Sequence, residues 1–409
     1  MRIIPGLGSS LTTPRGAWVG MLLVSSGAMA LFPLLPALQD SLDIPTSAIG
    51  AIAAAGFAGA LIAELGLASY ADRGRARLMG VLGVALVAAS LVGSAFATQA
   101  WHLAIGRGIG GVGVGMFTAA ATALLVRSDP ARSGELLGRL SAAELLGVAL
   151  GPMAAAVLLE VAEPGPILAG VGVVVLLAVP VVLATFVEHR PQAGVLKHQP
   201  PRVAFDLLVS GRVAGIVLLF SAIWLTTGAY DGIWPRFMDD IGAEPALTAA
   251  SYAVFALPYV LVAGAAGRFA DRRGGVRAFV LGAAIQIPIV ALYGIIVDPW
   301  VATGVALLES SGQAFAIIGA AAALAHTVDP ARAGGSQGLM RAAGLIAATV
   351  AAAASGAVYQ WGGPIVLFVG TAAAVVLVAV IGLACIRSSS RLSESNRRPT
   401  HYECVALAD

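Results

Sequence analysis

Charged residues are scarce in this sequence. Only 11% of its 409 residues are Asp, Glu, Lys or Arg, whereas an ordinary soluble domain carries about 25%. Hydrophobic residues make up 58% of the chain. Because so few charges cannot keep a chain of this composition in solution, the composition excludes a water-soluble enzyme. It equally excludes a disordered, collagen-like or small disulfide-stapled protein.

Cysteine and lysine are nearly absent as well. Cys385 and Cys404 both lie near the C-terminus, which leaves no disulfide framework and no cysteine metal site. The only lysine, Lys197, is not part of a G-x-x-x-x-G-K-[ST] phosphate-binding loop, so ATP-driven transport by this chain is not expected. The five histidines lack metal-ligand spacing. We therefore expect no cofactor, no metal and no enzymatic activity.

Long apolar runs, by contrast, fill the chain. A helix needs about 20 apolar residues to cross a hydrocarbon core of about 30 Å. Twelve runs meet this length, at residues 17–37, 47–67, 78–97, 101–125, 136–159, 165–187, 213–234, 247–266, 278–297, 300–325, 337–358 and 364–386. The sequence therefore predicts an all-α integral membrane protein with twelve transmembrane helices.

The basic residues indicate how these helices are oriented. All of them except Arg107 and Arg236 fall in segments on the N-terminal side of the membrane, and the opposite side carries acids such as Asp43, Glu160 and Asp298. Since short cytoplasmic loops are enriched in Lys and Arg, both termini are predicted to be cytoplasmic, in a plasma (inner) membrane. The clusters mark topology and indicate no nucleic-acid partner.

A polar segment and an internal repeat divide the chain into two halves. The division predicts an N-terminal six-helix bundle over 1–187, a cytoplasmic linker over 188–208, a second bundle over 209–387, and a polar cytoplasmic tail over 388–409 without regular structure. Asp129-Pro130-Ala131-Arg132 recurs as Asp329-Pro330-Ala331-Arg332. Parallel repeats of this kind place a binding site between the halves near the bilayer midplane.

A loop motif in the second half carries a family resemblance. Residues 267–274 read Gly-Arg-Phe-Ala-Asp-Arg-Arg-Gly, which resembles the G-x-L-A-D-R-x-G motif of the major facilitator superfamily of secondary transporters. A less complete copy, Ala71-Asp72-Arg73, follows the second span. The resemblance implies the fold of that family, two six-helix bundles, and a cytoplasmic gate at Asp72, Arg73, Gly267, Asp271, Arg272 and Gly274. Each aspartate would face the positive end of a helix in the other half, Asp72 the eleventh span and Asp271 the fifth. The plainer alternative is a basic loop that only fixes topology.

The fifth span contains a second motif of the same family. Gly138, Gly147, Gly151 and Pro152 have the spacing of its antiporter motif, and the resemblance implies an exporter, closest in pattern to the twelve-helix drug/proton antiporters. Small residues allow close helix approach, and proline loosens the local hydrogen-bond ladder. Packing by small residues alone is the alternative interpretation.

Ionisable residues inside the spans are the candidate coupling groups. Arg107, in a stretch that resembles the family's R-x-x-x-G motif, should face a water-filled cavity or a counter-charge, because an arginine costs at least about 2.5 kcal/mol there. Glu144 and Glu309 should lie near the midplane, where a carboxyl can take up and release a proton. Gln313 follows Glu309 by one turn and should share its face. Glu64 is expected to pair with nearby loop arginines.

The seventh span adds Trp224, Tyr230 and Asp231, which are predicted to line the cavity, although aromatic residues near a span's end are often interfacial anchors. Together these features predict a proton-driven exporter of drugs or small hydrophobic metabolites that works by alternating access, monomeric in the lipid bilayer. The alternative is an uptake symporter or facilitator for a small polar or anionic solute, with Arg107 binding an anion. A non-transporting membrane receptor or assembly subunit would need no charges at the midplane. The substrate itself does not follow from the sequence.

Overall fold

The computed structural model describes residues 12–129, 132–186, 203–329 and 332–395. Within these ranges the regular structure is entirely helical, as predicted. The first half comprises α1 (Thr12–Ala30), η1 (Phe32–Leu34), α2 (Leu35–Leu42), α3 (Thr46–Ile62), η2 (Ala63–Leu67), α4 (Ala68–Tyr70), η3 (Ala71–Arg75), α5 (Ala76–Ala95), α6 (Ala100–Ser128), α7 (Ser133–Leu159), α8 (Pro164–Leu176) and α9 (Ala178–Thr185). The second comprises η6 (Phe205–Val209), α10 (Gly211–Asp240), α11 (Pro245–Arg273), α12 (Gly275–Leu292), η7 (Tyr293–Ile295), α13 (Pro299–Ala325) and α14 (Ala333–Ser395).

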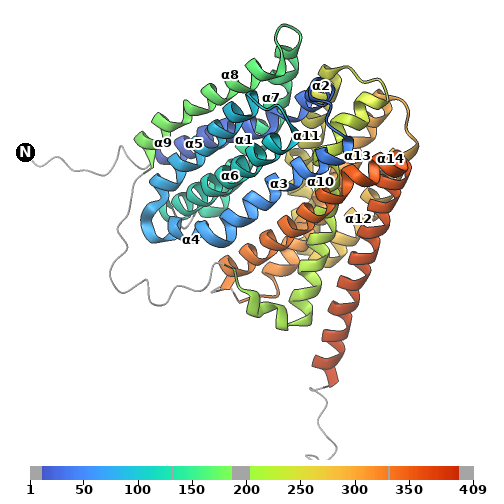
Figure 1. Ribbon diagram of the computed structural model, residues 1–409. Coiled ribbons are helices and arrows are strands. Elements are labelled where there is room, and N and C mark those ends of the chain that lie inside the picture. Colours follow the sequence, from blue (N-terminus) through green and yellow to red (C-terminus); the bar gives the residue numbers. More distant parts are fainter. Residues whose placement is uncertain (1–11, 130–131, 187–202, 330–331, 396–409) are drawn as a thin grey trace, which may run out of the picture.

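Eleven continuous helical stretches in the described residues are long and apolar enough to cross a membrane. The last of them spans 57 residues, which at 1.5 Å per residue is about 85 Å and far exceeds one crossing. Gly363 interrupts it with φ 70°, a backbone conformation that disfavours residues with a Cβ, and Pro364 follows. α14 therefore contains the eleventh and twelfth predicted spans, and Figure 1 shows the chain reversing between its orange and red parts.

The end of α14 corrects one expectation. We expected no regular structure after residue 387, but α14 continues to Ser395 and projects beyond the other helices in Figure 1. The remainder of the predicted tail, and most of the predicted linker, lie outside the described residues. The linker's last residues form the short helix η6, which leaves Phe205 and Val209 exposed.

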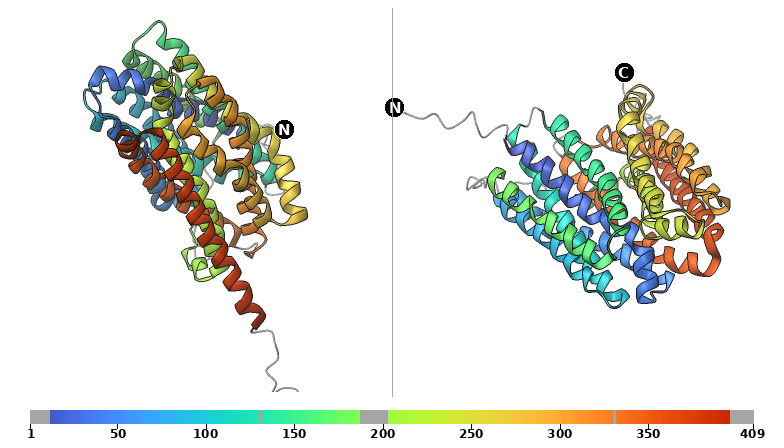
Figure 2. Two further views of the ribbon diagram at one scale, coloured as in Figure 1. Left: turned by 90° about the vertical axis from the view of Figure 1, so that its right-hand side faces the viewer. Right: turned by 90° about the horizontal axis from the view of Figure 1, so that it is seen from above.

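The helices gather into two groups that correspond to the two halves of the sequence. Figure 2 (right) shows α1–α9 on one side and α10–α14 on the other. We call the end of the molecule with Asp43, Glu160 and Asp298 at its helix ends the acidic side. The end with Arg127, Arg132 and Arg332 is the arginine-rich side. These two names describe the ends without assigning either to the cytoplasm.

The halves are in tight contact on the acidic side. An added Cβ at Gly50 of α3 would lie 2.4 Å from the carbonyl oxygen of Ala352 in α14. One at Gly356 of α14 would lie 2.6 Å from the oxygen of Thr46. Backbones approach this closely only where a side chain is missing, so glycine permits the seal between the halves here.

Candidate functional site

A cavity of about 1310 Å³ lies between the halves. Its walls come from α1, η2, α6 and α7 on one side and from α10, α11, α13 and α14 on the other. Arg127 near the end of α6, and Gly334 and Arg341 near the start of α14, line it at the arginine-rich side. Asp231 and Trp234 line it toward the sealed acidic side. The cavity therefore opens on the arginine-rich side.

Helical periodicity explains which side chains line the cavity. On α11 the lining residues recur with spacings of three and four, so they form one face of the helix: Tyr252, Phe255, Ala256 and Tyr259. On α10 they recur over four turns: Phe220, Trp224, Thr227, Tyr230, Asp231 and Trp234. Trp224, Tyr230 and Asp231, which the sequence suggested as lining, all lie in this row. The wall of the second half is consequently rich in aromatic rings.

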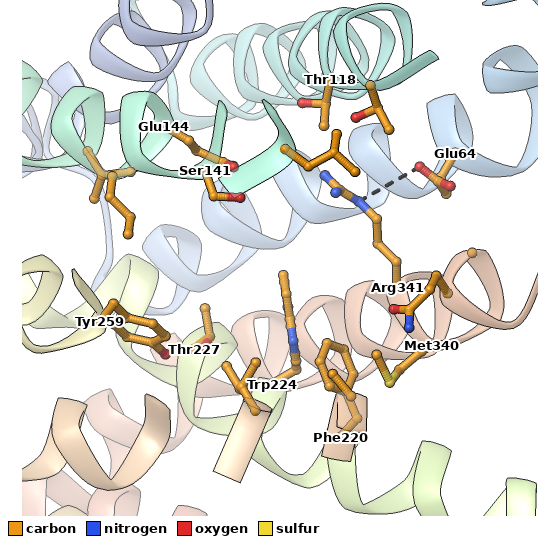
Figure 3. Close-up of a pocket in the computed structure, with 18 of the residues that line it drawn as sticks. Glu64, Thr118, Ser141, Glu144, Phe220, Trp224, Thr227, Tyr259, Met340 and Arg341 are labelled. Carbon is orange, nitrogen blue, oxygen red and sulfur yellow. Dashed lines mark ion pairs between the residues drawn. The ribbon is translucent and has the colours of Figure 1, made fainter. Parts of the chain in front are cut away.

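The facing wall of the first half is more polar. Figure 3 shows Glu144 and Ser141 of α7 across the cavity from Trp224 and Tyr259. Glu144 is partly buried, and within the described chain it forms no hydrogen bond and no ion pair. A carboxylate without a partner thus faces an aromatic wall.

Arg107 finds a counter-charge rather than the open cavity. Its Nη2 lies 3.5 Å from Oδ2 of Asp231, across the boundary between the halves. Its Nη1 donates to the carbonyl oxygen of Ala28 at 3.0 Å, and its guanidinium lies 4.7 Å from the ring centre of Phe32. Of these two residues, Asp231 lines the cavity and Arg107 does not. The sequence predicted that Arg107 would face either a water-filled cavity or a counter-charge, and in the structure it faces the counter-charge of Asp231.

Glu309 lies behind the cavity wall in a buried polar cluster. Its side chain has 0% exposure. Gln286 donates from Nε2 to its Oε1 at 3.2 Å, and the hydroxyl of Tyr293 donates to its Oε2 at 3.3 Å. Gln286 Nε2 also donates to Thr226, 3.2 Å away. Glu309 has no cation within ion-pair distance in the described chain.

Gln313 lies on the same buried face of α13 as Glu309 but reaches the cavity. It lines the wall and donates to the hydroxyl of Thr227 at 3.2 Å. The expected shared face is therefore present, although Glu309 itself is one layer deeper.

Glu64 forms an ion pair with an arginine of the other half. Its Oε2 lies 3.8 Å from Nε of Arg341, which belongs to α14 of the other half. Figure 3 shows this pair bridging the two walls. Arg341 falls within the predicted span 337–358, and α14, which begins at Ala333, places it on a helix that lines the cavity.

The residues of the predicted gate are spread over the arginine-rich side. Arg73 lies 5.5 Å from the ring of Tyr70, and the side chain of Asp72 is outside the described part of the structure. Asp271 and Arg272 are exposed. Gly274 ends α11 with φ 93°, and Gly267 has open space around it. The contacts expected from Asp72 and Asp271 stay predictions, and they apply to a state that is closed on this side.

The glycines of the fifth-span motif behave in two ways. An added Cβ at Gly147 would lie 2.6 Å from the oxygen of Leu22, and one at Gly151 would lie 2.2 Å from that of Ser26. Both glycines therefore allow α7 to approach α1. Gly138 faces open space, so the expectation of close packing is wrong there. α7 continues through Pro152.

Sequence reasoning missed several polar residues of the site. Gln286, Thr226 and Tyr293 complete the Glu309 cluster, and Tyr252 and Tyr259 belong to the cavity wall. A search for amide and hydroxyl side chains inside apolar spans would have found Gln286. The same search would have found the tyrosines, but their signal is weaker because tyrosine often serves as an interfacial anchor in membrane helices.

Comparison with known proteins identifies the family. The family model for the Major Facilitator Superfamily matches residues 17–233 and again 216–401. The chain belongs to the Major Facilitator Superfamily. No curated protein sequence matches it. As a member of this superfamily it is a multi-pass membrane transporter for small molecules.

Solved structures share its fold at low sequence identity. A bacterial homologue of the human lysosomal transporter Spinster, inward-facing and unoccupied, aligns with a TM-score of 0.78 at 13% identity, covering 94% of this chain and 98% of that one. The nucleoside transporter NupG gives 0.70 at 14% identity, covering 93% and 99%. The human organic anion transporter MFSD10 gives 0.66 at 18%, covering 91% and 99%. Neighbours at this identity establish the fold and leave the substrate open.

Proposed function

We propose that this transporter exports small, largely apolar molecules in exchange for protons, with Glu309 as the proton-carrying group. The observation that carries the proposal is the burial of this carboxyl without a counter-ion among the described residues. A lone buried carboxylate costs several kcal/mol, and a bound proton removes that cost. Release of the proton then requires that water reach the cluster.

The position of Glu309 relates proton binding to the cavity. Gln313, one turn along α13, lines the cavity, and Tyr293, which donates to Glu309, packs edge-on against Tyr230 of the cavity wall at 5.9 Å. A rearrangement of α10 or α13 that opens the acidic side would therefore also change the surroundings of Glu309. An inward proton supplies about 2.3 kcal/mol per 100 mV of membrane potential.

Export is favoured by two observations. The cavity opens on the arginine-rich side, which the distribution of basic residues assigns to the cytoplasm, so substrate can load from there. The fifth-span glycines Gly147 and Gly151 resemble an antiporter motif and pack against α1. The alternative of anion uptake relied on Arg107, but this arginine is engaged by Asp231 and Ala28 and does not line the cavity.

Proton movement in proteoliposomes tests the proposal. Purified protein is reconstituted with a pH-sensitive dye inside, a pH gradient is imposed, and lipophilic cations, neutral aromatic compounds and small anions are added in turn. We expect at least one lipophilic compound to trigger proton flux in the wild type, and we expect Glu309→Gln to abolish it. Glu160→Gln, an exposed acid beyond the end of α7, is the matched control. Substrate flux that ignores both the gradient and Glu309→Gln would reject proton coupling, and proton flux with co-transport of an anion would favour uptake.

A further inference from the structure

The closed end of the cavity contains polar atoms that lack partners. Tyr252 is 8% exposed and lines the cavity, and its hydroxyl forms no hydrogen bond in the described chain. Asp231 uses Oδ2 toward Arg107, and no described donor reaches its Oδ1. Buried polar groups are normally hydrogen-bonded, so two unused oxygens at one end of a cavity indicate that a ligand group completes them.

Aromatic rings surround these oxygens. Trp234 and Phe255 line the same end, with their ring centres 5.6 Å apart in an edge-to-face arrangement. The indole N–H of Trp234 donates to Ser251 at 2.8 Å, so this tryptophan offers the cavity only its ring. Tyr252 is close enough to both Asp231 and Arg107 to interact with their charges. Acceptor oxygens and π systems therefore dominate this end.

The groups present select the charge of the ligand. An ammonium group has up to three N–H donors and no acceptor. It matches a carboxylate oxygen and a hydroxyl oxygen, and aromatic faces attract cations. An anionic group would meet Asp231 without a free cation, because Arg107 lies outside the cavity lining and already contacts Ala28 and Asp231. The chemistry of this end therefore favours a cation that is itself a hydrogen-bond donor.

We propose that Asp231, Tyr252 and Trp234 form a subsite for the ammonium group of an amphipathic amine, whose apolar part lies along the aromatic wall toward Trp224. This inference rests on the proposed function, since it names the substrate class of the same cavity. The bound ammonium takes the unused Oδ1 of Asp231 and shares this carboxylate with Arg107. Because the Arg107–Asp231 pair joins the halves, amine binding weakens one of their contacts at the closed end.

Equilibrium binding of three probes with one ring system tests the subsite. Naphthylethylamine, naphthylethanol and naphthylacetate are titrated at neutral pH against purified protein in nanodiscs, with empty nanodiscs subtracted. A charge-assisted hydrogen bond and a cation–π contact together should make the amine bind at least about tenfold more tightly than the alcohol. Asp231→Asn should bring the Kd of the amine close to that of the alcohol, whose own Kd stays nearly unchanged.

Two further variants keep the test decisive if Asp231→Asn fails to fold. Tyr252→Phe removes only a hydroxyl, and it should weaken amine binding by about threefold to tenfold. Tyr70→Phe, outside the cavity lining, is the matched control. Glu144→Gln tests the cavity acid that has no partner in the described chain. Equal Kd values for amine and alcohol, or a loss of amine preference in Glu144→Gln alone, would overturn the assignment to Asp231.

The binding assay uses no proton gradient, so its result is independent of proton coupling. Amine preference at Asp231 without proton flux in the proteoliposomes would support the subsite and reject the proposed exchange. Proton flux without amine preference would support the proposed exchange and reject the subsite.

Discussion

The two sides of the molecule use the same small residue to opposite effect. On the acidic side, Gly50 and Gly356 bring the backbones of α3 and α14 into contact, and neither glycine has room for a Cβ. On the arginine-rich side, Gly134 and Gly334, which occupy equivalent positions in the repeat, both face open space. One side is sealed and the other is open. Gly134 and Gly334 have no close neighbours in this state, so they are free to pack against another helix when the arginine-rich side closes and the acidic side opens. Alternating access would use them in this way.

Polar contacts surround the seal on the acidic side. Gln360 of α14 accepts a hydrogen bond from the backbone N–H of Ser47 at 2.8 Å, and so caps the first turn of α3 from the other half. Arg236 of α10 contacts Asp240 at 2.7 Å and approaches Asp40 of the first half at 4.0 Å. At the open, arginine-rich end of the cavity, the Glu64–Arg341 pair at 3.8 Å is a comparable contact between charged groups of the two halves.

The strongest way to break this comparison is to add a methyl group inside the seal. Gly356→Ala places a Cβ 2.6 Å from Thr46 and 2.7 Å from Ser47 backbone oxygens. Overpacking of this kind costs about 1–3 kcal/mol, which should shift the population toward a state open on the acidic side by about fivefold to 150-fold. The readout is maleimide labelling of Ala54→Cys, a residue buried between the halves.

Gly370→Ala is the matched control for this substitution. It lies on the same helix with no atom within 4 Å of the added Cβ, so labelling should stay at the wild-type level. Equal labelling in both variants would show that the glycine contacts do not hold the acidic side closed.

A smaller effect is expected from the cap of α3. Gln360→Ala removes the acceptor for the N–H of Ser47, and loss of a helix cap typically costs about 0.5–2 kcal/mol. Labelling at Ala54→Cys should rise severalfold. Gln360→Glu keeps an acceptor oxygen and should label like the wild type. If the two variants label alike, the cap contributes nothing to the seal.

Arg236 should matter less still. Its closest partners, Asp239 and Asp240, lie on its own helix, and its contact with Asp40 across the halves is long and exposed. Such pairs contribute about 0–1 kcal/mol and weaken in salt. Arg236→Gln should therefore raise labelling by less than Gln360→Ala, and high salt should remove the difference. A larger effect than that of Gln360→Ala would reverse this order.

The smallest expected effect concerns the arginine-rich side. Arg332 donates to both carboxylate oxygens of Asp206, at 2.7 Å for Oδ1, and this hydrogen bonding lowers the pKa of Asp206 below its ordinary value of 3.8. A lowered folded-state pKa stabilises the protein above the ordinary value, and that contribution disappears as the pH falls through the lowered one. Asp206→Asn should slightly lower Tm at neutral pH.

Because the side chain of Asp206 is largely solvent-exposed and that of Arg332 is 35% exposed, this change in Tm should be small, and the two proteins should converge in strong acid. Thermal unfolding in detergent measures it. A difference that persists or grows as the pH falls would exclude the ion pair as its cause.

The sequence was a good guide to the fold for a simple physical reason. A helix satisfies its backbone hydrogen bonds within its own segment, so in a bilayer the length of an apolar run locates each span. The sequence also separated two spans within α14, because Gly363 and Pro364 interrupt the apolar run. The same reasoning failed after residue 387, where α14 extends beyond its apolar stretch.

The site was less predictable because its key relations connect the two halves. The sequence singled out Arg107 and Asp231 separately, but their ion pair joins residues 124 positions apart. Glu309 and Gln313 were found together, since one helical turn relates them, yet nothing local shows that only Gln313 reaches the cavity. Gly138 matched the motif as well as Gly147 did, and only the neighbouring helix distinguishes them.

Reciprocal labelling tests the central claim most directly. Single cysteines at Ala54, in the seal, and at Thr122, in the cavity wall, are introduced into a Cys385→Ser/Cys404→Ser background and labelled with a membrane-impermeant maleimide. The account predicts that Gly356→Ala raises labelling at Ala54→Cys and lowers it at Thr122→Cys. Labelling that rises at both positions, or that changes at neither, would contradict alternating access between these two sides.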